Sequence, residues 1–193
     1  MKRGSVTESG AVGGADSGSK PLPAQPYRKQ RLRCMRVFLA LPPGRKRLLV
    51  EAFLELGRAR LQLRRPFAQV APTLGAAMRE TPKARADDRE RAKVRQIADA
   101  IGAMSRHTPW SSMCFTRAVA AMRMLERRGI ACTLFLGTGR EESGGLAAHA
   151  WLRSGDIYLT GAEEMKRFTV VGKFAKPART KSRMDGSHRE EAR

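Results

Sequence analysis

Apolar residues recur at intervals of three and four along three segments of the chain, a period that is typical of amphipathic helices. The segments are residues 45–64, residues 88–106, and a third that begins near Met113 and ends at Gly129. The first also has an Arg/Lys face. We therefore expect three helices before residue 130.

Beyond Gly129 the pattern changes to short runs of strand-forming residues separated by Gly and Ser turns. These runs cover residues 130–136, 147–153, 157–159 and 168–171. We expect a turn at Ser154-Gly155 to join the second run to the third. Helices followed by an antiparallel β-meander predict an α+β fold.

Composition divides the chain into four parts. Residues 1–26 are rich in Gly and Ser, and a disordered tail is expected there because such a segment buries little apolar surface. We expect a basic helical annex at 27–82, a core at 83–175 and a second disordered tail at 176–193. The start lacks the apolar stretch of a secretory signal, and no apolar run approaches the ~18 residues of a membrane span, which favours the cytoplasm.

Charge is the strongest compositional signal, with a formal net charge of +20 from 38 Lys and Arg against 18 Asp and Glu. Such a charge suits an acidic peptide, an anionic membrane surface or nucleic acid. Aromatic residues are only 6% of the chain and do not alternate with basic ones, as they do in single-strand binders. A nucleic-acid-binding protein without catalysis is therefore kept only as an alternative. The basic helix at 45–64 could dock a partner or a membrane surface.

The three cysteines, Cys34, Cys114 and Cys132, are odd in number and lack the spacing of zinc ligands. This argues for reduced thiols in a cytosol, and neither a metal nor a cofactor is expected. Cys132 lies inside an apolar strand run, and we interpret it and Cys34 as structural.

Cys114 and His149 are the candidate catalytic pair. Cys114 opens the third helix, where the free N–H groups and the helix dipole stabilise a thiolate. His149 lies in a strand run, flanked by alanines. A thiol and an imidazole together can form a nucleophile and its base. His107, in the loop before the helix, and His188, in the tail, fit this role less well.

Two tryptophans adjoin these residues, and each has two interpretations. Trp110 either walls a substrate cleft beside Cys114 or is a plain core residue. Trp151 shares a strand face with His149, because side chains two positions apart in a strand point the same way. It either shields the pair from water or only packs.

Residues 110–130 (WSSMCFTRAVAAMRMLERRGI) and 148–152 (AHAWL) together resemble the transglutaminase-like leader peptidases of lasso-peptide biosynthesis. Residues 159–171 are similar to the closing strands of that family, and residues 41–53 to its N-terminal helices. The resemblance covers about residues 35–175. It implies a transglutaminase/papain-like core with the cysteine nucleophile at a helix N-terminus.

The resemblance also implies a function and partners. Cys114 would be the nucleophile and His149 the base of a cysteine protease that removes the leader from a lasso precursor peptide. A leader-recognition protein would present the precursor, and an ATP-dependent macrolactam cyclase would take the released core. This chain has no β-rich recognition domain before its helices, so we expect that protein to be a separate chain. An acyl transferase using the same Cys-His pair is the alternative enzyme.

The family's third catalytic member, an Asp that orients the histidine, does not carry over to one position. A hairpin turning at Ser154-Gly155 would pair Arg153 with Asp156 and His149 with Thr160, or with Gly161 if the turn is one residue longer.

The third role therefore stays open among Thr160, Asp156 and Glu163. The register favours Thr160, and it expects Asp156 to form an ion pair with Arg153 across the turn. Glu163 and Glu164 follow the strand and could fold back toward the histidine.

Overall fold

A computed structural model describes residues 36, 38–110, 112–140 and 144–179. The chain divides into two compact units, Met1–Ala40 and Leu41–Arg193. In the first unit, residues 36 and 38–40 are described, and they are helical. Several sequence expectations lie outside the described residues, namely the tail at 1–26, the part of the expected 176–193 tail from residue 180 onward, Cys34 and His188. Lys176, expected in that second tail, is instead the last residue of a strand. The following paragraphs concern the second unit.

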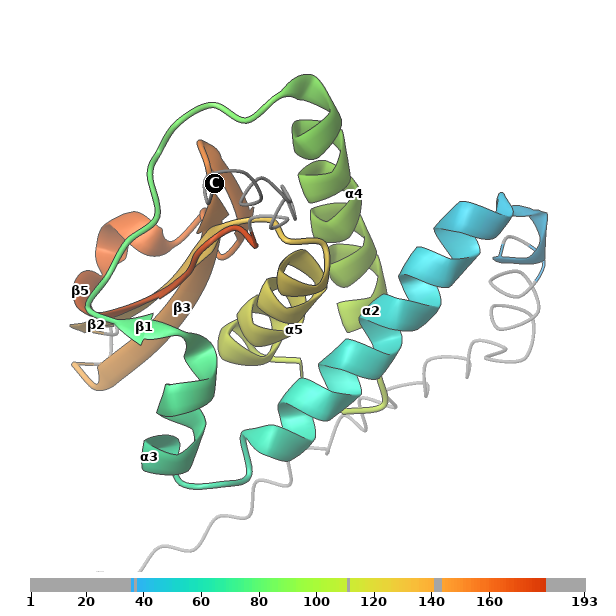
Figure 1. Cartoon of the computed structure of the whole chain (residues 1–193). Coiled ribbons are helices and arrows are strands. Elements are labelled where there is room, and N and C mark those ends of the chain that lie inside the picture. Colours follow the sequence, from blue (N-terminus) through green and yellow to red (C-terminus); the bar gives the residue numbers. More distant parts are fainter. Residues whose placement is uncertain (1–35, 37, 111, 141–143, 180–193) are drawn as a thin grey trace, which may run out of the picture. The chain divides into compact units, whose positions relative to one another are not determined.

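The three expected helices are present (Figure 1). Between the first and second of them the chain forms two short helical turns, and Pro66 and Pro72 begin or lie within these turns. Asp87 caps the second long helix, because its carboxylate accepts a hydrogen bond from the Glu90 N–H. The helices are α2 (Pro43–Gln62), α3 (Phe67–Val70), η1 (Ala71–Leu74), α4 (Asp88–Ser105) and α5 (Cys114–Arg127).

A five-stranded sheet with the order β1-β5-β2-β3-β4 completes an α+β fold, as predicted. The strands β2, β3 and β4 form the expected meander. The last strand, β5, lies on the other side of β2, antiparallel to it, and the two-residue β1 pairs with β5. The bounds are β1 Ala76–Ala77, β2 Cys132–Arg140, β3 Leu146–Ser154, β4 Ile157–Thr160 and β5 Thr169–Lys176.

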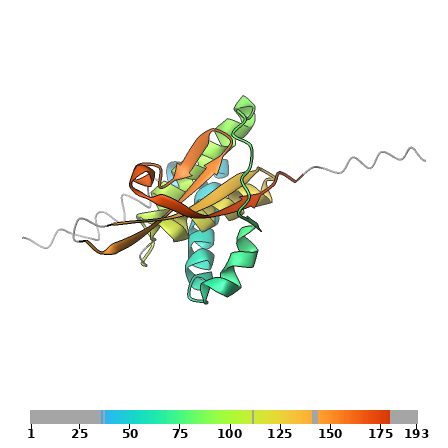
Figure 2. The same cartoon turned by 90° about the vertical axis from the view of Figure 1, so that its left-hand side faces the viewer.

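Helix α5 lies at the centre of this unit. It contacts α2 and α4 on one side and β2, β3 and β4 on the other (Figures 1 and 2). This position explains its composition, because a helix that is covered on opposite sides needs apolar residues around most of its circumference. Its buried residues are Thr116, Ala118, Val119, Ala120, Ala121, Met122, Met124 and Leu125.

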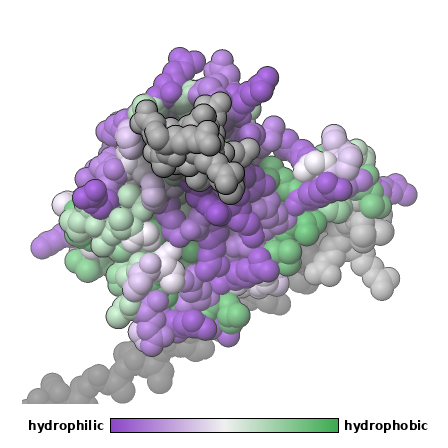
Figure 3. Space-filling view, in the orientation of Figure 1, coloured by the Kyte–Doolittle hydropathy of each residue, from purple (hydrophilic) through white to green (hydrophobic). Residues whose placement is uncertain are grey.

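A buried carboxylate joins α2 to α5. Glu55, on the inner face of α2, accepts from Arg58 at 2.7 Å and lies 2.9 Å from an Arg127 nitrogen of α5. Arg123 of α5 is 3.7 Å away. The charge of Glu55 is thereby paired, which a buried carboxylate requires. On the other side of α2 the surface mixes basic and hydrophobic side chains, and the exposed hydrophobic ones are Val50, Leu54 and Leu61 (Figure 3).

The β3–β4 turn differs from the expectation. The two central residues of the turn are Gly155 and Asp156, and Ser154 pairs with Ile157. Further along the hairpin, the β3–β4 register shifts between Leu152 and Arg153, so that Leu152 pairs with Thr160. Gly155 has a φ of +56°, which glycine adopts without a Cβ penalty. The predicted pairing of His149 with Thr160 is therefore wrong.

The expected ion pair between Asp156 and Arg153 is also wrong. Asp156 binds Arg91 of α4 instead, with its Oδ2 2.6 Å from Arg91 Nη1. This guanidinium lowers the pKa of Asp156 below its ordinary value. Arg153 is buried, and it donates to the Glu80 carboxylate at 2.8 Å and to the Thr81 carbonyl at 2.8 Å. Asp156 and Arg153 therefore each form an ion pair with a residue far away in the sequence, and not with each other.

Among the helices of the described residues, none is both long enough and apolar enough to cross a bilayer.

The two ends of β3 predict a matched pair of stability effects. Leu152 is fully buried, whereas Leu146 is 82% exposed. Leu152→Ala should lower the free energy of unfolding by about 2–5 kcal/mol, because it removes buried methyl groups and leaves a cavity. Leu146→Ala should change it by no more than about 0.5 kcal/mol. Urea unfolding followed by circular dichroism measures both, and equal effects would contradict the burial described for β3.

Candidate active site

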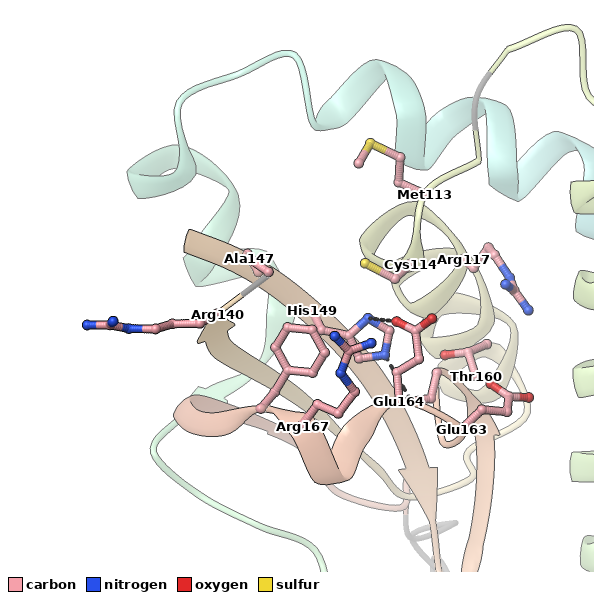
Figure 4. A pocket seen from close by; sticks show the side chains of 13 residues that line it. Met113, Cys114, Arg117, Arg140, Ala147, His149, Thr160, Glu163, Glu164 and Arg167 are labelled. Atoms are coloured by element: carbon pink, nitrogen blue, oxygen red, sulfur yellow. Dashed lines mark hydrogen bonds and ion pairs between the residues drawn. The ribbon is translucent and has the colours of Figure 1, made fainter. Parts of the chain in front are cut away.

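A pocket of about 430 Å³ opens where the start of α5 meets β3 and the segment after β4 (Figure 4). It brings the two predicted catalytic residues, Cys114 and His149, into one site. The short helix η2 (Met165–Arg167) closes one side. The lining residues are Met113, Cys114, Arg117, Arg140, Ala147, Ala148, His149, Thr160, Gly161, Glu163, Glu164, Arg167 and Phe168.

Cys114 is the first residue of α5, and its side chain is half-buried. The residue before the helix is Met113, which supplies no side-chain cap. The hydroxyl of Ser112 lies 2.8 Å from that of Thr108. The first N–H groups of a helix have no partner within the helix. They therefore stay available near the thiol, where they stabilise negative charge on sulfur or on a substrate oxygen.

His149 is oriented by a backbone carbonyl. Its Nε2 lies 2.9 Å from the carbonyl oxygen of Gly161. A carbonyl oxygen only accepts hydrogen bonds, so Nε2 must carry the proton and donate it. In the neutral ring Nδ1 is then unprotonated and is the basic nitrogen. In Figure 4 this nitrogen is on the Cys114 side of the ring.

Glu164 is the carboxylate nearest to this nitrogen. Its Oε2 lies 3.8 Å from Nδ1, and the side chain is 60% exposed. Once the ring has taken a proton, Nδ1 carries positive charge, which a carboxylate at this distance stabilises. The sequence left the third role open and placed Glu164 only among residues able to fold back toward the histidine.

The imidazole is held by aromatic rings as well. Its ring centroid lies 4.9 Å from that of Phe168 and 5.9 Å from that of Trp151, with near-parallel planes in both cases. Trp151 stacks in turn on Phe135 of β2. The side chain of His149 is consequently only 9% exposed. Trp151 supports the ring from behind and is absent from the pocket lining.

Trp110 also lies away from the pocket lining. Its ring packs against Phe53 of α2, with centroids 5.5 Å apart. A Cβ added to Gly57 would lie 3.5 Å from the same ring. Trp110 therefore packs the Cys114 loop onto α2, which matches the core interpretation and not the cleft-wall interpretation. His107 follows α4 and does not line the pocket either.

The structure separates the three candidates for the third role. Thr160 lines the pocket but pairs with Leu152, and its buried hydroxyl has no hydrogen-bond partner among the described residues. Asp156 is bound to Arg91 and is absent from the lining. Glu163 lines the pocket, yet its neighbour Glu164 is the one next to the ring. The contact that orients His149 comes from the backbone of Gly161.

Three arginines of the pocket were not anticipated. Arg117, Arg140 and Arg167 come from α5, β2 and η2, which are far apart in the sequence. Arg117 lies one helical turn after Cys114, and its Nε is buried without a hydrogen-bond partner among the described residues. Only the i, i+3 spacing from Cys114 could have indicated Arg117.

Cys132 differs from Cys114 in its surroundings. It is buried inside β2, and burial raises the pKa of its thiol to about 12. This agrees with a structural role. Within the described ranges, no cluster of three or more His, Cys, Asp or Glu side chains could hold a metal ion.

Comparison with known families agrees with this geometry. The domain of the transglutaminase-like superfamily matches residues 57–173, more than half of the chain, and the chain therefore belongs to this superfamily. No curated protein and no solved structure matches the chain. A transglutaminase-like domain fits a cysteine peptidase or an acyl transferase.

The two described cysteines should differ in reactivity. At pH 7 iodoacetamide should alkylate Cys114 much faster than Cys132, because Cys132 is buried and its thiol, with a pKa of about 12, is almost fully protonated. Peptide mapping by mass spectrometry over time measures both rates. Equal rates, or faster labelling of Cys132, would contradict an activated thiol at the start of α5.

Gly161 should tolerate no side chain. Its φ is +71°, and a Cβ there would lie 2.6 Å from the Ala150 carbonyl oxygen and 2.9 Å from His149 Nε2. Gly161→Ala should displace the imidazole and slow the alkylation of Cys114 at pH 7 about tenfold, because the thiol loses the base that takes its proton.

Gly129→Ala is the matched control for this variant. Gly129 has a similar φ of +68°, but the nearest atom to an added Cβ is 3.5 Å away and outside the pocket. It should therefore share the backbone cost of Gly161→Ala without the loss of thiol reactivity. Equal reactivity of the two variants would exclude an orienting role for the Gly161 carbonyl.

Proposed function

We propose that this chain is a cysteine peptidase that removes the leader from a lasso precursor peptide, with Cys114 as nucleophile and His149 as base. One observation carries the proposal. The thiol at the start of α5 and an imidazole whose Nδ1 is left free by the Gly161 contact line the same pocket. Such a pair is the minimum that thiol-based acyl chemistry requires.

The reaction follows from these positions. His149 Nδ1 takes the thiol proton, and the thiolate attacks the carbonyl carbon of the scissile amide. Free N–H groups at the start of α5 stabilise the negative charge that develops on the carbonyl oxygen. The C–N bond breaks, the imidazolium returns its proton to the leaving amine, and a thioester to Cys114 remains. Water, deprotonated by the same imidazole, hydrolyses the thioester and releases the leader with a new carboxylate.

Two contacts define the surroundings of the ring nitrogens. The Gly161 carbonyl accepts from Nε2, and Glu164 Oε2 lies 3.8 Å from Nδ1, the nitrogen that takes the thiol proton. The stacked rings of Phe168 and Trp151 restrict its rotation, so little orientation is lost when the proton moves.

The precursor class is inferred from resemblance. Residues 110–130 and 148–152 are similar to the lasso-peptide leader peptidases, and both catalytic candidates lie within these motifs. In that scheme a separate leader-recognition protein presents the precursor and a macrolactam cyclase takes the core, in the cytoplasm. The formal net charge of +20 suits an acidic leader or an acidic partner surface.

An acyl transferase is the second candidate, since the superfamily fits it equally. The two activities share the thioester and differ only in its acceptor, which is water for a peptidase and an amine for a transferase. Cleavage in isotopically labelled water separates them. A peptidase places the label in the new carboxylate of the leader, whereas a transferase attaches the added amine there.

Loss of either catalytic side chain should abolish leader release. Cys114→Ala has no nucleophile and His149→Ala no base, so each should reduce the rate by a factor of about a thousand or more. Mass spectrometry of the precursor, incubated with enzyme and leader-recognition protein, measures release.

Cys132→Ala and His107→Ala are the matched controls, because neither residue lines the pocket. Both should retain nearly full activity. Leader release by Cys114→Ala at the wild-type rate would exclude the peptidase mechanism.

A further inference from the structure

Positively charged side chains outnumber negatively charged ones in the lining of the active-site pocket. Arg117, Arg140 and Arg167 come from α5, β2 and η2, and the acidic residues of the lining are Glu163 and Glu164. With the imidazole neutral, three positive charges and two negative ones leave a formal charge of +1. A cleft with a positive lining attracts anionic groups, because its walls exclude part of the water that would screen the charge.

Arg117 is the arginine of this set whose donors are unused. Its side chain is half-buried, and the buried Nε has no acceptor among the described residues. In the part of the chain that the structure describes, no carboxylate lies within ion-pair distance of its guanidinium. Further along α5, by contrast, Arg123 and Arg127 both pair with Glu55. A partly buried guanidinium without an acceptor is costly, and a bound anion removes that cost.

Arg117 and Cys114 lie on one face of α5. They are three positions apart, a spacing at which helical side chains are neighbours, and both line the pocket. In Figure 4 the guanidinium of Arg117 is on one side of the thiol, and Ala147 of β3 is on the other. A peptide whose carbonyl carbon reaches the thiol therefore passes the guanidinium on one side of the scissile bond only.

A carboxylate is the group that matches this guanidinium. The planar fork of an arginine binds both oxygens of a carboxylate at once, whereas an amide offers one uncharged oxygen. In a peptide, Asp and Glu are the side chains that carry a carboxylate. The pocket's own carboxylates, those of Glu163 and Glu164, are on exposed side chains, and Glu164 lies beside His149 Nδ1. Neither is within ion-pair distance of Arg117, so the guanidinium is open to a ligand.

We propose that Arg117 binds the carboxylate of an Asp or Glu side chain of the substrate, on one side of the scissile bond, and so selects precursors that are acidic at that position. For the identity of the substrate, the inference rests on the proposed function. Arg140 and Arg167 add to the positive charge of the pocket, while Arg117, next to the thiol on α5, makes the contact. This specificity is narrower than a general attraction of acidic peptides to a basic protein.

A pair of thiol reagents tests carboxylate binding without a precursor. N-bromoacetyl-glutamate α-amide and N-bromoacetyl-glutamine α-amide differ only in the carboxylate or amide that ends the side chain. With either reagent the thiolate of Cys114 displaces bromide and forms a thioether. Each rate, followed by mass spectrometry, is divided by that of N-acetylcysteine with the same reagent. The wild-type protein should then prefer the glutamate reagent about tenfold, because only this reagent forms a charge-assisted hydrogen bond.

Arg117→Gln should abolish this preference, because a glutamine side chain carries no charge to pair with the carboxylate. Arg95→Gln is the matched control, since Arg95 is exposed on α4, does not line the pocket and changes the net charge by the same amount. It should keep the tenfold preference. The ratio of two rates within one variant cancels any change in thiol reactivity. If Arg117 acted on the thiol alone, both rates would change together and the ratio would stay as in the wild type.

A second measurement uses the precursor with the leader-recognition protein. Each Asp and Glu near the scissile bond is replaced singly by Asn or Gln, and kcat/KM for leader release is measured. One replacement should lower kcat/KM about tenfold in the wild-type enzyme and cause no further loss in Arg117→Gln. A precursor with Arg at that position should be cleaved faster by Arg117→Glu than by the wild-type enzyme. Damage to the fold cannot produce such a reversal.

The outcomes separate this inference from the proposed function. Equal relative rates for the two reagents, a wild-type ratio in Arg117→Gln, or additive losses with the precursor would overturn carboxylate binding by Arg117. A ratio that is lost in Arg167→Gln and kept in Arg117→Gln would assign the carboxylate to η2 and would overturn it too. If the reagents behave as expected but the wild-type enzyme with its recognition protein releases no leader, the peptidase proposal fails, and carboxylate binding beside a reactive thiol stands.

Discussion

The burial of α5 between two helices and a sheet is the constraint on which the site depends. A helix covered on opposite sides cannot shift or rotate without disturbing both layers, because packed interiors have almost no free volume. Its first residue, Cys114, is therefore fixed relative to β3 and His149. The buried carboxylate of Glu55 strengthens this arrangement from the α2 side, since its arginine partners come from both helices. The reacting groups are positioned by the core and not by a loop.

The parts of this molecule that follow from local pattern could be predicted. The spacing of Leu49, Ala52, Leu56 and Ala59 indicated α2, and all four are buried. Both catalytic candidates came from residue type and position within an element. The division into an annex at 27–82 and a core at 83–175 stays a prediction. The β3–β4 register could not be read correctly, because it depends on a shift at Leu152 and on the pairing of Asp156 with Arg91, 65 residues away.

The group that orients His149 cannot be identified from residue types, because it is a backbone carbonyl. The residues that the sequence offers for this role, Thr160, Asp156 and Glu163, all have side chains that can accept a proton or a hydrogen bond. The group in contact is a peptide carbonyl, which every residue has, and only the tertiary fold brings that of Gly161 to the ring. The sequence gives only an indirect sign of this contact, which is the glycine at position 161. A Cβ there would lie 2.9 Å from His149 Nε2.

A peptide carbonyl in this position has a further consequence, for the dependence of the site on acidity. A carboxylate that accepts a hydrogen bond from an imidazole loses its charge when the solution becomes acidic, and the hydrogen bond weakens. The Gly161 carbonyl takes up no proton in water of any ordinary pH, so its contact with the ring does not depend on the charge of an acidic group. The orientation of the imidazole is therefore set by the backbone and not by an ionisable side chain.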